Sequence, residues 1–250
     1  GYRPAPENLQ SRSQFAECRF GIFLHWGLYA MLAQGEWAMT NHNLNYREYE
    51  KLAGGFYPSK FDADAWAEAF RQAGARYVCF TTRHHDGFSM FRTAQTPYNI
   101  VDATPFARDA VKELADACPR RGLRVHFYYS LIDWWREDAP RGRTGLGTGR
   151  PAEKEDADAY FGFMKAQLTE LLTNYGEVFE VWFDGANGGT GYYGGTRPTT
   201  KNIDKTTYYD WPNIADFVHK LQPGATVWGR EFRWCGNEDG YSGRTCWANS

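Results

Sequence analysis

The chain has 250 residues, enough for one large domain of the size of an α/β barrel. Its 28 basic and 30 acidic residues give a net charge of −2 with no basic block, which argues against nucleic acid as a partner. No apolar stretch reaches membrane-spanning length, and the five cysteines have neither CxxC nor zinc-finger spacing, so we expect no membrane span and no metal finger.

Apolar runs alternate with helical patterns along the chain. Five runs are predicted as strands: residues 20–25, 76–82, 124–130, 178–184 and 226–229. Helices are predicted at residues 46–52, from about 62 to Gly74, at 109–121, 152–175 and 211–221. Residues 1–14 are polar and are expected to wrap the surface, and the glycine-rich residues 185–200 are expected to form a loop.

Strands that alternate with helices predict a parallel sheet with helical crossovers. A closed (β/α)₈ barrel needs eight strands, so we expect residues 1–250 to be the N-terminal part of such a catalytic domain, incomplete at its C-terminus. An open doubly wound sheet is the alternative. It would place a glycine-rich phosphate turn after the first strand, where His25, Trp26 and Gly27 stand instead.

The predicted strand at residues 178–184 ends on the strongest candidate for chemistry. Side chains alternate along a strand, so Glu180, Trp182 and Asp184 share one face, while Val181 and Phe183 pack under helices. In a parallel barrel the carboxyl ends of the strands form the active-site mouth. Asp184 is therefore a candidate catalytic carboxylate, and a helix-capping Asp is the structural alternative.

Two adjacent histidines, His84 and His85, end the second predicted strand. They can donate hydrogen bonds to vicinal hydroxyls or bind a metal. Metal ligands on a strand usually have HxH spacing, and adjacent histidines need an irregular turn to face one way. We therefore rank sugar binding above metal binding, and one of the two histidines can also be structural.

Aromatic and polar side chains follow the other predicted strands. His25 and Trp26 end the first strand, and Glu36 and Trp37 lie shortly after it. Together they would suit a monosaccharide, although a lone histidine is more often a hydrogen-bonded core residue. The high aromatic content, 17% with 10 Trp and 16 Tyr, fits stacking on sugar rings as well as a Trp-rich core.

The third predicted strand and the C-terminal segment complete the candidate set. Alternation favours Tyr128 as the inward hydroxyl, and a twist at the strand end leaves Tyr129 open. Near the C-terminus, Glu238 follows Arg233 and Trp234 on a glycine-flanked loop. A second carboxylate is what glycoside hydrolysis requires, whereas a solvated acidic loop is the alternative.

Several motifs, in order along almost the whole chain, resemble those of the family 29 α-L-fucosidases. They are HWG at 25–27, EW at 36–37, GARYVCFTTRHHDGF at 74–88, RD at 108–109, YYS at 128–130, DW at 133–134 and VWFDG at 181–185. HHDGF together with WFDG is specific, whereas HWG alone is weak. The tail FRWCGNEDG resembles the branch of the family that prefers branched, linkage-specific fucosides.

The resemblance implies a retaining hydrolase on a (β/α)₈-like barrel, normally followed by a β-sandwich that we expect to be absent from residues 1–250. Asp184 matches the nucleophile and Glu238 the acid/base, whose position varies across the family. The fucose-contacting positions are matched by His25, Glu36, Trp37, His84, His85, Trp182 and one of Tyr128 and Tyr129, with Trp26, Arg233 and Trp234 as further candidates.

The implied substrate is a fucosylated oligosaccharide or glycan, and neither a metal nor a cofactor is implied. Scavenging fucose from glycans favours a periplasmic or extracellular location. Two other functions are kept: a catalytically inactive fucose-binding protein from a truncated barrel, and a metal-dependent hydrolase built on His84, His85 and Asp184.

Overall fold

The computed structural model describes residues 3–142, 144–185, 189–190, 202–203, 211–228 and 231. Its strands are β1 (Gly21–Leu24), β2 (Tyr77–Arg83), β3 (Arg124–Ser130), β4 (Glu180–Asp184), β5 (Gly189–Thr190), β6 (Asn202–Ile203) and β7 (Thr226–Trp228). Its α-helices are α1 (Pro6–Cys18), α2 (Ala38–Asn41), α3 (Tyr46–Tyr49), α4 (Ala63–Gln72), α5 (Ala110–Arg120), α6 (Ala157–Asn174) and α8 (Trp211–Leu221). Short 3₁₀ helices are η1 (Leu28–Leu32), η2 (Glu50–Gly55) and η3 (Leu146–Thr148).

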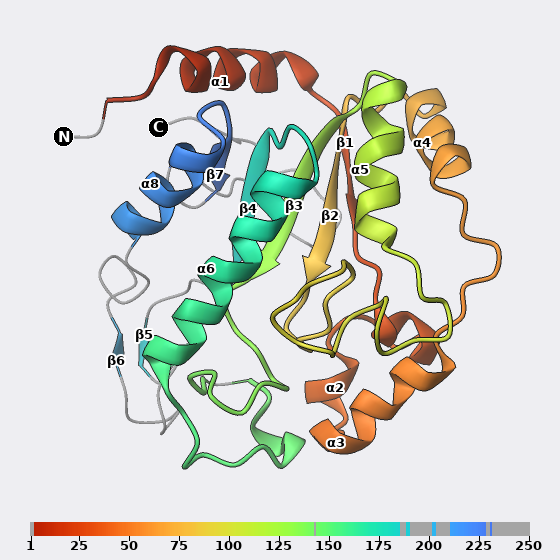
Figure 1. Cartoon of the computed structure of the whole chain (residues 1–250), viewed down its shortest axis with the longest axis vertical. Helices are drawn as coiled ribbons and strands as arrows, with labels where there is room; N and C mark the ends of the chain where they lie inside the picture. Colours follow the sequence, from red (N-terminus) through yellow and green to blue (C-terminus); the bar gives the residue numbers. More distant parts are fainter. Residues whose placement is uncertain are drawn as a thin grey trace, which may run out of the picture.

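Five strands form one parallel sheet in the order β1-β2-β3-β4-β7, with every neighbouring pair parallel (Figure 1). The predicted α/β class, the parallel sheet and the five strands are thereby confirmed. The two outer strands, β1 and β7, are not paired with each other, so the described strands form an open sheet. All five carboxyl ends point the same way, toward the end of the molecule where α2 and α3 lie.

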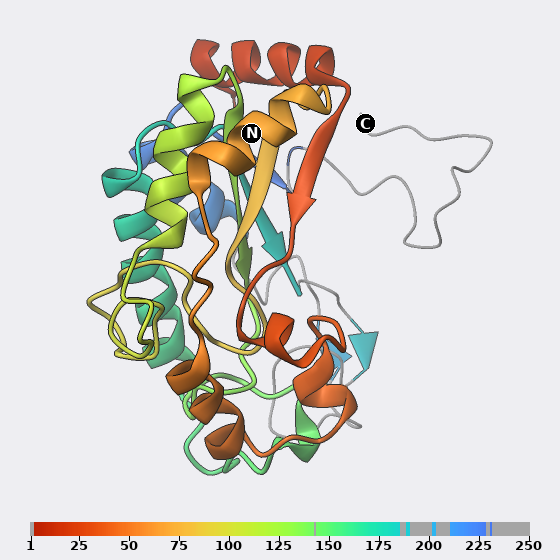
Figure 2. The same cartoon turned by 90° about the vertical axis from the view of Figure 1, so that its right-hand side faces the viewer.

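The two faces of the sheet differ in chemistry. Helices α4, α5 and α6 lie on one face (Figures 1 and 2), where Val125, Phe127 and Val181 of the central strands are buried. The opposite face carries aromatic rings: Trp182 contacts Phe23 with ring centroids 4.9 Å apart and stacks on Trp228 at 3.9 Å. Burial of the aliphatic side chains against the helices stabilises the sheet, and the alternation leaves polar and aromatic side chains to line the other face.

Aspartates cap the N-termini of helices α4, α5 and α6. Asp62, Asp109 and Asp156 each accept a hydrogen bond from the backbone N–H three residues later, at 2.9 to 3.0 Å. This satisfies a donor that a helix start leaves unpaired. Of the two candidate caps of α4, Asp62 is the one used, and Gly74 follows that helix with φ +90°, a conformation that favours glycine.

Three sequence predictions are corrected. Residues 6–18 form α1, which the sequence pattern missed because the apolar residues of this segment lack helical spacing. Asn8 Nδ2 donates to the carbonyl of Ala225 at 2.9 Å and so ties the helix to the residue that precedes β7. The long helix α6 begins at Ala157 rather than near residue 152, because Asp156 caps it there. The helix predicted at 46–52 changes from α3 to the tighter η2 at Glu50.

No helix within these described ranges combines the length and the apolar character that a membrane crossing requires.

Candidate active site

Asp184 is the last residue of β4, and its carboxylate is 40% exposed at the carboxyl end of the sheet. Tyr128 Oη, on the neighbouring β3, donates a hydrogen bond to Asp184 Oδ2 at 2.6 Å. The backbone N–H of Gly185 donates to Oδ1 at 2.7 Å. These two hydrogen bonds fix the orientation of a carboxylate that solvent can still reach.

Tyr128 keeps its proton for this hydrogen bond. Burial raises its pKa well above 10, and the negative charge of Asp184 adds to the effect. Tyr129, the other candidate hydroxyl on this strand, lies on the helix side, where its Oη donates to Gln167 Oε1 at 2.8 Å. The geometry therefore assigns Tyr128 and not Tyr129 to the candidate site.

A bulge in β2 turns the two histidines toward Asp184. The pairing of β2 with β3 shifts between Thr81 and Arg83, so one extra residue enters β2, and Thr82 Oγ1 donates to the carbonyl of Tyr128 at 2.6 Å. A bulge redirects the side chains that follow it. His84 then stacks on the ring of Tyr128, with centroids 5.2 Å apart and an interplanar angle of 6°.

His85 reaches the site through a tight turn, the irregular turn that adjacent histidines require. The N–H of Gly87 donates to the carbonyl of His84 at 3.1 Å, and Gly87 has φ +76°. A Cβ at Gly87 would lie 2.6 Å from Asp133 Oδ1, so glycine is needed here for space as well. The turn brings His85 Nε2 to 3.4 Å from Asp184 Oδ2.

Both histidines are neutral in the folded protein near neutral pH. Burial holds the pKa of His84 well below 6.5, and the neighbouring His85 and His25 add to the effect. Burial, followed by the positive charge of Arg83, lowers the pKa of His85 to about 3. Each ring therefore offers one donor and one acceptor, which suits hydroxyl groups.

The first strand supplies His25 but not Trp26. The His25 ring lies 5.3 Å from His84 and 5.6 Å from Tyr128, on the same side of the sheet as Asp184. Trp26, the next residue, points the other way and packs on Phe61 at 5.0 Å. Trp26 therefore belongs to the core, and its backbone N–H, which donates to Thr81 Oγ1 at 3.1 Å, ties the end of β1 to β2.

Trp37 forms one wall of the site. Its ring meets His85 edge-on at 5.4 Å and Trp134 at 5.2 Å, and Glu36 precedes it in a partly buried position. Trp134 was not among the site candidates and is buried, with its backbone N–H donating to the carbonyl of His85 at 2.7 Å. Trp182 lies farther from the strand ends, between Phe23 and Trp228.

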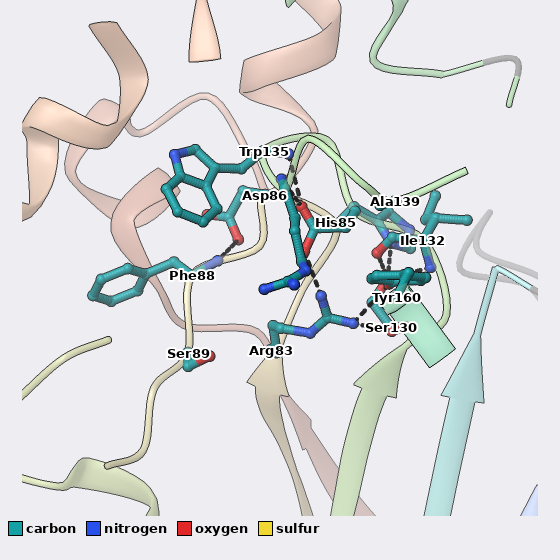
Figure 3. Close-up of polar contacts among 12 residues, drawn as sticks. Arg83, His85, Asp86, Phe88, Ser89, Ser130, Ile132, Trp135, Ala139 and Tyr160 are labelled. Carbon is teal, nitrogen blue, oxygen red and sulfur yellow. Dashed lines mark hydrogen bonds and ion pairs between the residues drawn. The ribbon is translucent and has the colours of Figure 1, made fainter. Parts of the chain in front are cut away.

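Arg83 joins the ends of β2 and β3 below His85 (Figure 3). Its buried guanidinium forms an ion pair with Asp133 and donates to the carbonyl of Ser130 at 2.7 Å and to Tyr160 Oη at 2.9 Å. The cation also lies 4.6 Å from the centre of the Tyr129 ring. A buried charge needs such partners, and by binding them Arg83 fixes the relative position of the two strand ends.

Asp86 makes stability depend on pH. Its buried carboxyl accepts from Tyr49 Oη at 2.7 Å and from the N–H of Phe88 at 3.2 Å. Burial raises its pKa from 3.8 to about 7, although these two hydrogen bonds oppose the increase. A folded-state pKa above the unfolded one stabilises the fold below about pH 4, and this contribution is lost as the pH rises through about 7.

We therefore expect the free energy of unfolding of Asp86→Asn, measured relative to that of the parent chain, to rise by about 4 kcal/mol between pH 4 and pH 8. Urea unfolding at several pH values measures this difference. Tyr49→Phe retains the carboxyl but removes a hydrogen bond that lowers its pKa, so it should keep a pH dependence at least as large as that of the parent. A difference between Asp86→Asn and the parent that does not change with pH would contradict the prediction.

Three site groups also have the geometry of cation ligands. His84, His85 and Asp184 each offer a ligand atom, and these atoms lie within 4.8 Å of one another. The same groups suit hydroxyls, so their positions alone do not separate a sugar site from a metal site. The other site candidates, Arg233, Trp234 and Glu238, lie outside the described residues.

Comparison with known proteins points in one direction. A family model described as Alpha-L-fucosidase matches residues 1–243. The chain is 30% identical to Alpha-L-fucosidase 1 of Arabidopsis thaliana, covering 98% of this chain and 42% of the plant protein. It is 32% identical to Putative alpha-L-fucosidase 1 of Oryza sativa subsp. japonica, covering 98% and 40% of the two chains.

Solved structures agree with these relatives. Alpha-L-fucosidase isoenzyme 1 from Paenibacillus thiaminolyticus has a TM-score of 0.75 and 35% identity, covering 90% of this chain and 51% of that one. Alpha-L-fucosidase AlfC from Lactobacillus casei, in complex with alpha-L-fucose product, has a TM-score of 0.73 and 29% identity, covering 88% and 71%. The chain thus spans about two fifths of the length of the two plant relatives.

Proposed function

We propose that this chain, which belongs to the alpha-L-fucosidase family, hydrolyses terminal α-linked fucose from oligosaccharides or glycoconjugates with retention of configuration. Membership rests on the family model and on the two plant relatives. The observation that carries the proposal is the exposed Asp184 carboxylate, held by Tyr128 and faced by two neutral histidines. The complex of AlfC with alpha-L-fucose adds support for the sugar.

In the proposed mechanism, Asp184 attacks the anomeric carbon of fucose while the bond to the leaving oxygen breaks, forming a covalent glycosyl-enzyme. Glu238 gives its proton to the leaving oxygen and then takes one from the water that hydrolyses the intermediate. Tyr128 keeps Asp184 oriented, and His25, His84 and His85 hydrogen-bond the sugar hydroxyls.

Of the two glutamates that follow β7 along the chain, Glu231 and Glu238, the structure describes Glu231. Glu231 is paired with His219 at 2.9 Å and with Arg12 at 3.1 Å. Burial raises its pKa, but the hydrogen bond from His219 and the other partners outweigh burial and lower it. A general acid must be protonated at the start, so Glu231 is unsuited to the role.

For the fold, we propose that β1 to β4 and β7 are the first strands of a (β/α)₈ barrel. Their parallel order and helical crossovers suit a barrel wall. The aromatic face with Phe23 and Trp182, of which Phe23 is 39% exposed, would then line the barrel interior. Because fucose is released from glycans, we propose a periplasmic or extracellular location, which cell fractionation tests.

The decisive experiment measures hydrolysis of a chromogenic α-L-fucoside beside a branched Lewis-type oligosaccharide, together with L-fucose binding by calorimetry. Release of fucose as the α-anomer, followed by NMR, supports the proposal. Cleavage of the oligosaccharide alone would indicate the linkage-specific branch. Fucose binding without turnover would instead favour the fucose-binding protein, and neither binding nor turnover would reject both.

Metal removal distinguishes a fucosidase from a metal-dependent hydrolase. We expect dialysis against EDTA to leave kcat/KM on the chromogenic fucoside unchanged, because in the proposed mechanism Asp184 is the nucleophile and Glu238 the acid/base, and no step needs a metal ion. Assays before dialysis, after dialysis and after adding back Zn²⁺ or Mn²⁺ measure this. A loss of activity that added metal restores would assign His84, His85 and Asp184 as ligands.

A further inference from the structure

Ser130 is a fully buried hydroxyl at the end of β3, on the same face as Tyr128 and Asp184. Its Oγ has three polar neighbours: His85 Nδ1 at 2.6 Å, the carbonyl oxygen of Ile132 at 2.6 Å and the N–H of Ile132 at 3.1 Å. His85, Ser130 and Ile132 meet beside the Arg83 guanidinium (Figure 3).

Counting protons at Ser130 Oγ fixes the direction of each hydrogen bond. A serine hydroxyl donates one hydrogen bond and accepts two. The Ile132 carbonyl can only accept, so it takes the single hydroxyl proton, and the Ile132 N–H can only donate. The remaining lone pair of Oγ must then receive a proton from His85 Nδ1.

The opposite arrangement leaves an unfavourable contact. If the Ser130 hydroxyl donated to His85 Nδ1, no proton would remain between Oγ and the Ile132 carbonyl oxygen, 2.6 Å away. Two buried acceptors at that distance repel each other. The backbone around Ile132 is also fixed, because the N–H of Leu131 donates to the carbonyl of Asp184 at 2.8 Å.

We propose that Ser130 is a positioning residue that holds His85 as the Nδ1–H tautomer, so that Nε2 presents a lone pair to the candidate sugar site. Nε2 then accepts a hydrogen bond from a sugar hydroxyl instead of donating one. The tautomer follows from the contacts of Ser130 alone, whereas the sugar as donor rests on the proposed function.

The tautomer has a consequence for Asp184. His85 Nε2 and Asp184 Oδ2 lie 3.4 Å apart with no proton between them, so Asp184 Oδ2 accepts from Tyr128 and not from His85. The carboxylate oxygen and the imidazole nitrogen therefore form a pair of adjacent acceptors. A sugar hydroxyl that donates to Nε2 fills this position without competing for the Tyr128 proton.

Nitrogen NMR of the chain labelled with ¹⁵N-histidine tests the tautomer directly. We expect Nε2 of His85 to resonate in the range of an unprotonated nitrogen and Nδ1 in the protonated range at neutral pH, with the signals assigned from His85→Gln. The reverse pattern in the parent chain would overturn the proposal. This reading requires no activity, so it stands even if the proposed function fails.

Three variants separate positioning from packing. In Ser130→Ala we expect the proton to move to Nε2, where Asp184 Oδ2 can accept it, and the affinity for L-fucose to fall about fivefold to tenfold. Ser130→Thr keeps the hydroxyl and should restore the parent spectrum. Ser89→Ala removes another fully buried hydroxyl, one that accepts from Gln167 at 2.9 Å, and should leave the His85 signals unchanged.

The spectra of the variants and the fucose affinity test the role of Ser130 and the proposed function separately. A Ser130→Ala spectrum identical to that of the parent would overturn the role of Ser130, whatever the fucose affinity. If Ser130→Ala does not fold, the parent spectrum together with Ser130→Thr decides. If the tautomer changes as expected but the parent chain does not bind fucose, the positioning role holds and the proposed function fails.

Discussion

Replacing Asp184 by Asn is expected to lower kcat/KM on an α-L-fucoside by at least about 10³-fold, or roughly 4 kcal/mol in the activation free energy. An amide has nearly the shape of the carboxylate but cannot attack the anomeric carbon. Asp184 is also partly exposed, so the variant should keep its fold and its affinity for L-fucose. Steady-state kinetics, calorimetry with L-fucose and circular dichroism measure the three quantities.

Tyr128→Phe is the matched control, because it removes only the hydrogen bond to Asp184 Oδ2. A hydrogen bond to a charged group contributes about 1.5–3 kcal/mol, so the loss should be roughly tenfold to a hundredfold. If the two variants lose activity equally, Asp184 has no special role as nucleophile. A loss below tenfold in Asp184→Asn would contradict the proposed mechanism.

Azide identifies the step that Asp184 performs. In Asp184→Gly the removed carboxylate leaves space at the nucleophile position, and azide added to the assay is expected to restore cleavage and to form β-fucosyl azide. The β-anomer forms because azide attacks from the face of the sugar that Asp184 occupied. Rescue that yields the α-azide would show that Asp184 acts in another way.

The alternation of side chains along the strands predicted much of the candidate site. The bounds of β3 match the prediction, and alternation along β4 placed Asp184 and Trp182 together on one face. The same rule would have removed Trp26, which follows the inward-facing His25 and therefore points to the core. It would also have marked Ser130, which shares a face with Tyr128. The sequence-based prediction of the site did not apply this alternation to Trp26 and Ser130.

Other features depend on contacts that sequence periodicity does not contain. The bulge in β2 and the turn at Gly87 bring both adjacent histidines to Asp184, although a regular strand would separate them. Trp134 enters the site because the loop after β3 folds back onto His85. Helix α1 was missed because its apolar residues form no continuous face: it is held by polar contacts such as Asn8 to Ala225 and by the single ring of Phe15, which packs on Tyr77.

Breaking the buried pair of Arg83 and Asp133 is expected to destabilise the fold strongly. Arg83 has no exposed surface, and its guanidinium is held by Asp133, the Ser130 carbonyl and Tyr160. Arg83→Met would leave the buried Asp133 carboxylate without its cation. Breaking such a pair costs about 3–5 kcal/mol of unfolding free energy, which urea unfolding at pH 7 measures.

A double-mutant cycle shows whether that cost comes from the orphaned charge. Asp133→Leu alone should also be strongly destabilising, whereas the double variant Arg83→Met/Asp133→Leu should lose less than the sum of the two, because neither charge is then left unpaired. The exposed pair of Arg71 and Glu68 is the control, and Arg71→Met should cost far less than Arg83→Met, because solvent screens the exposed pair. Strictly additive losses at Arg83 and Asp133 would mean that their charges are not coupled. The guanidinium would then contribute chiefly through its packing on the Tyr129 ring.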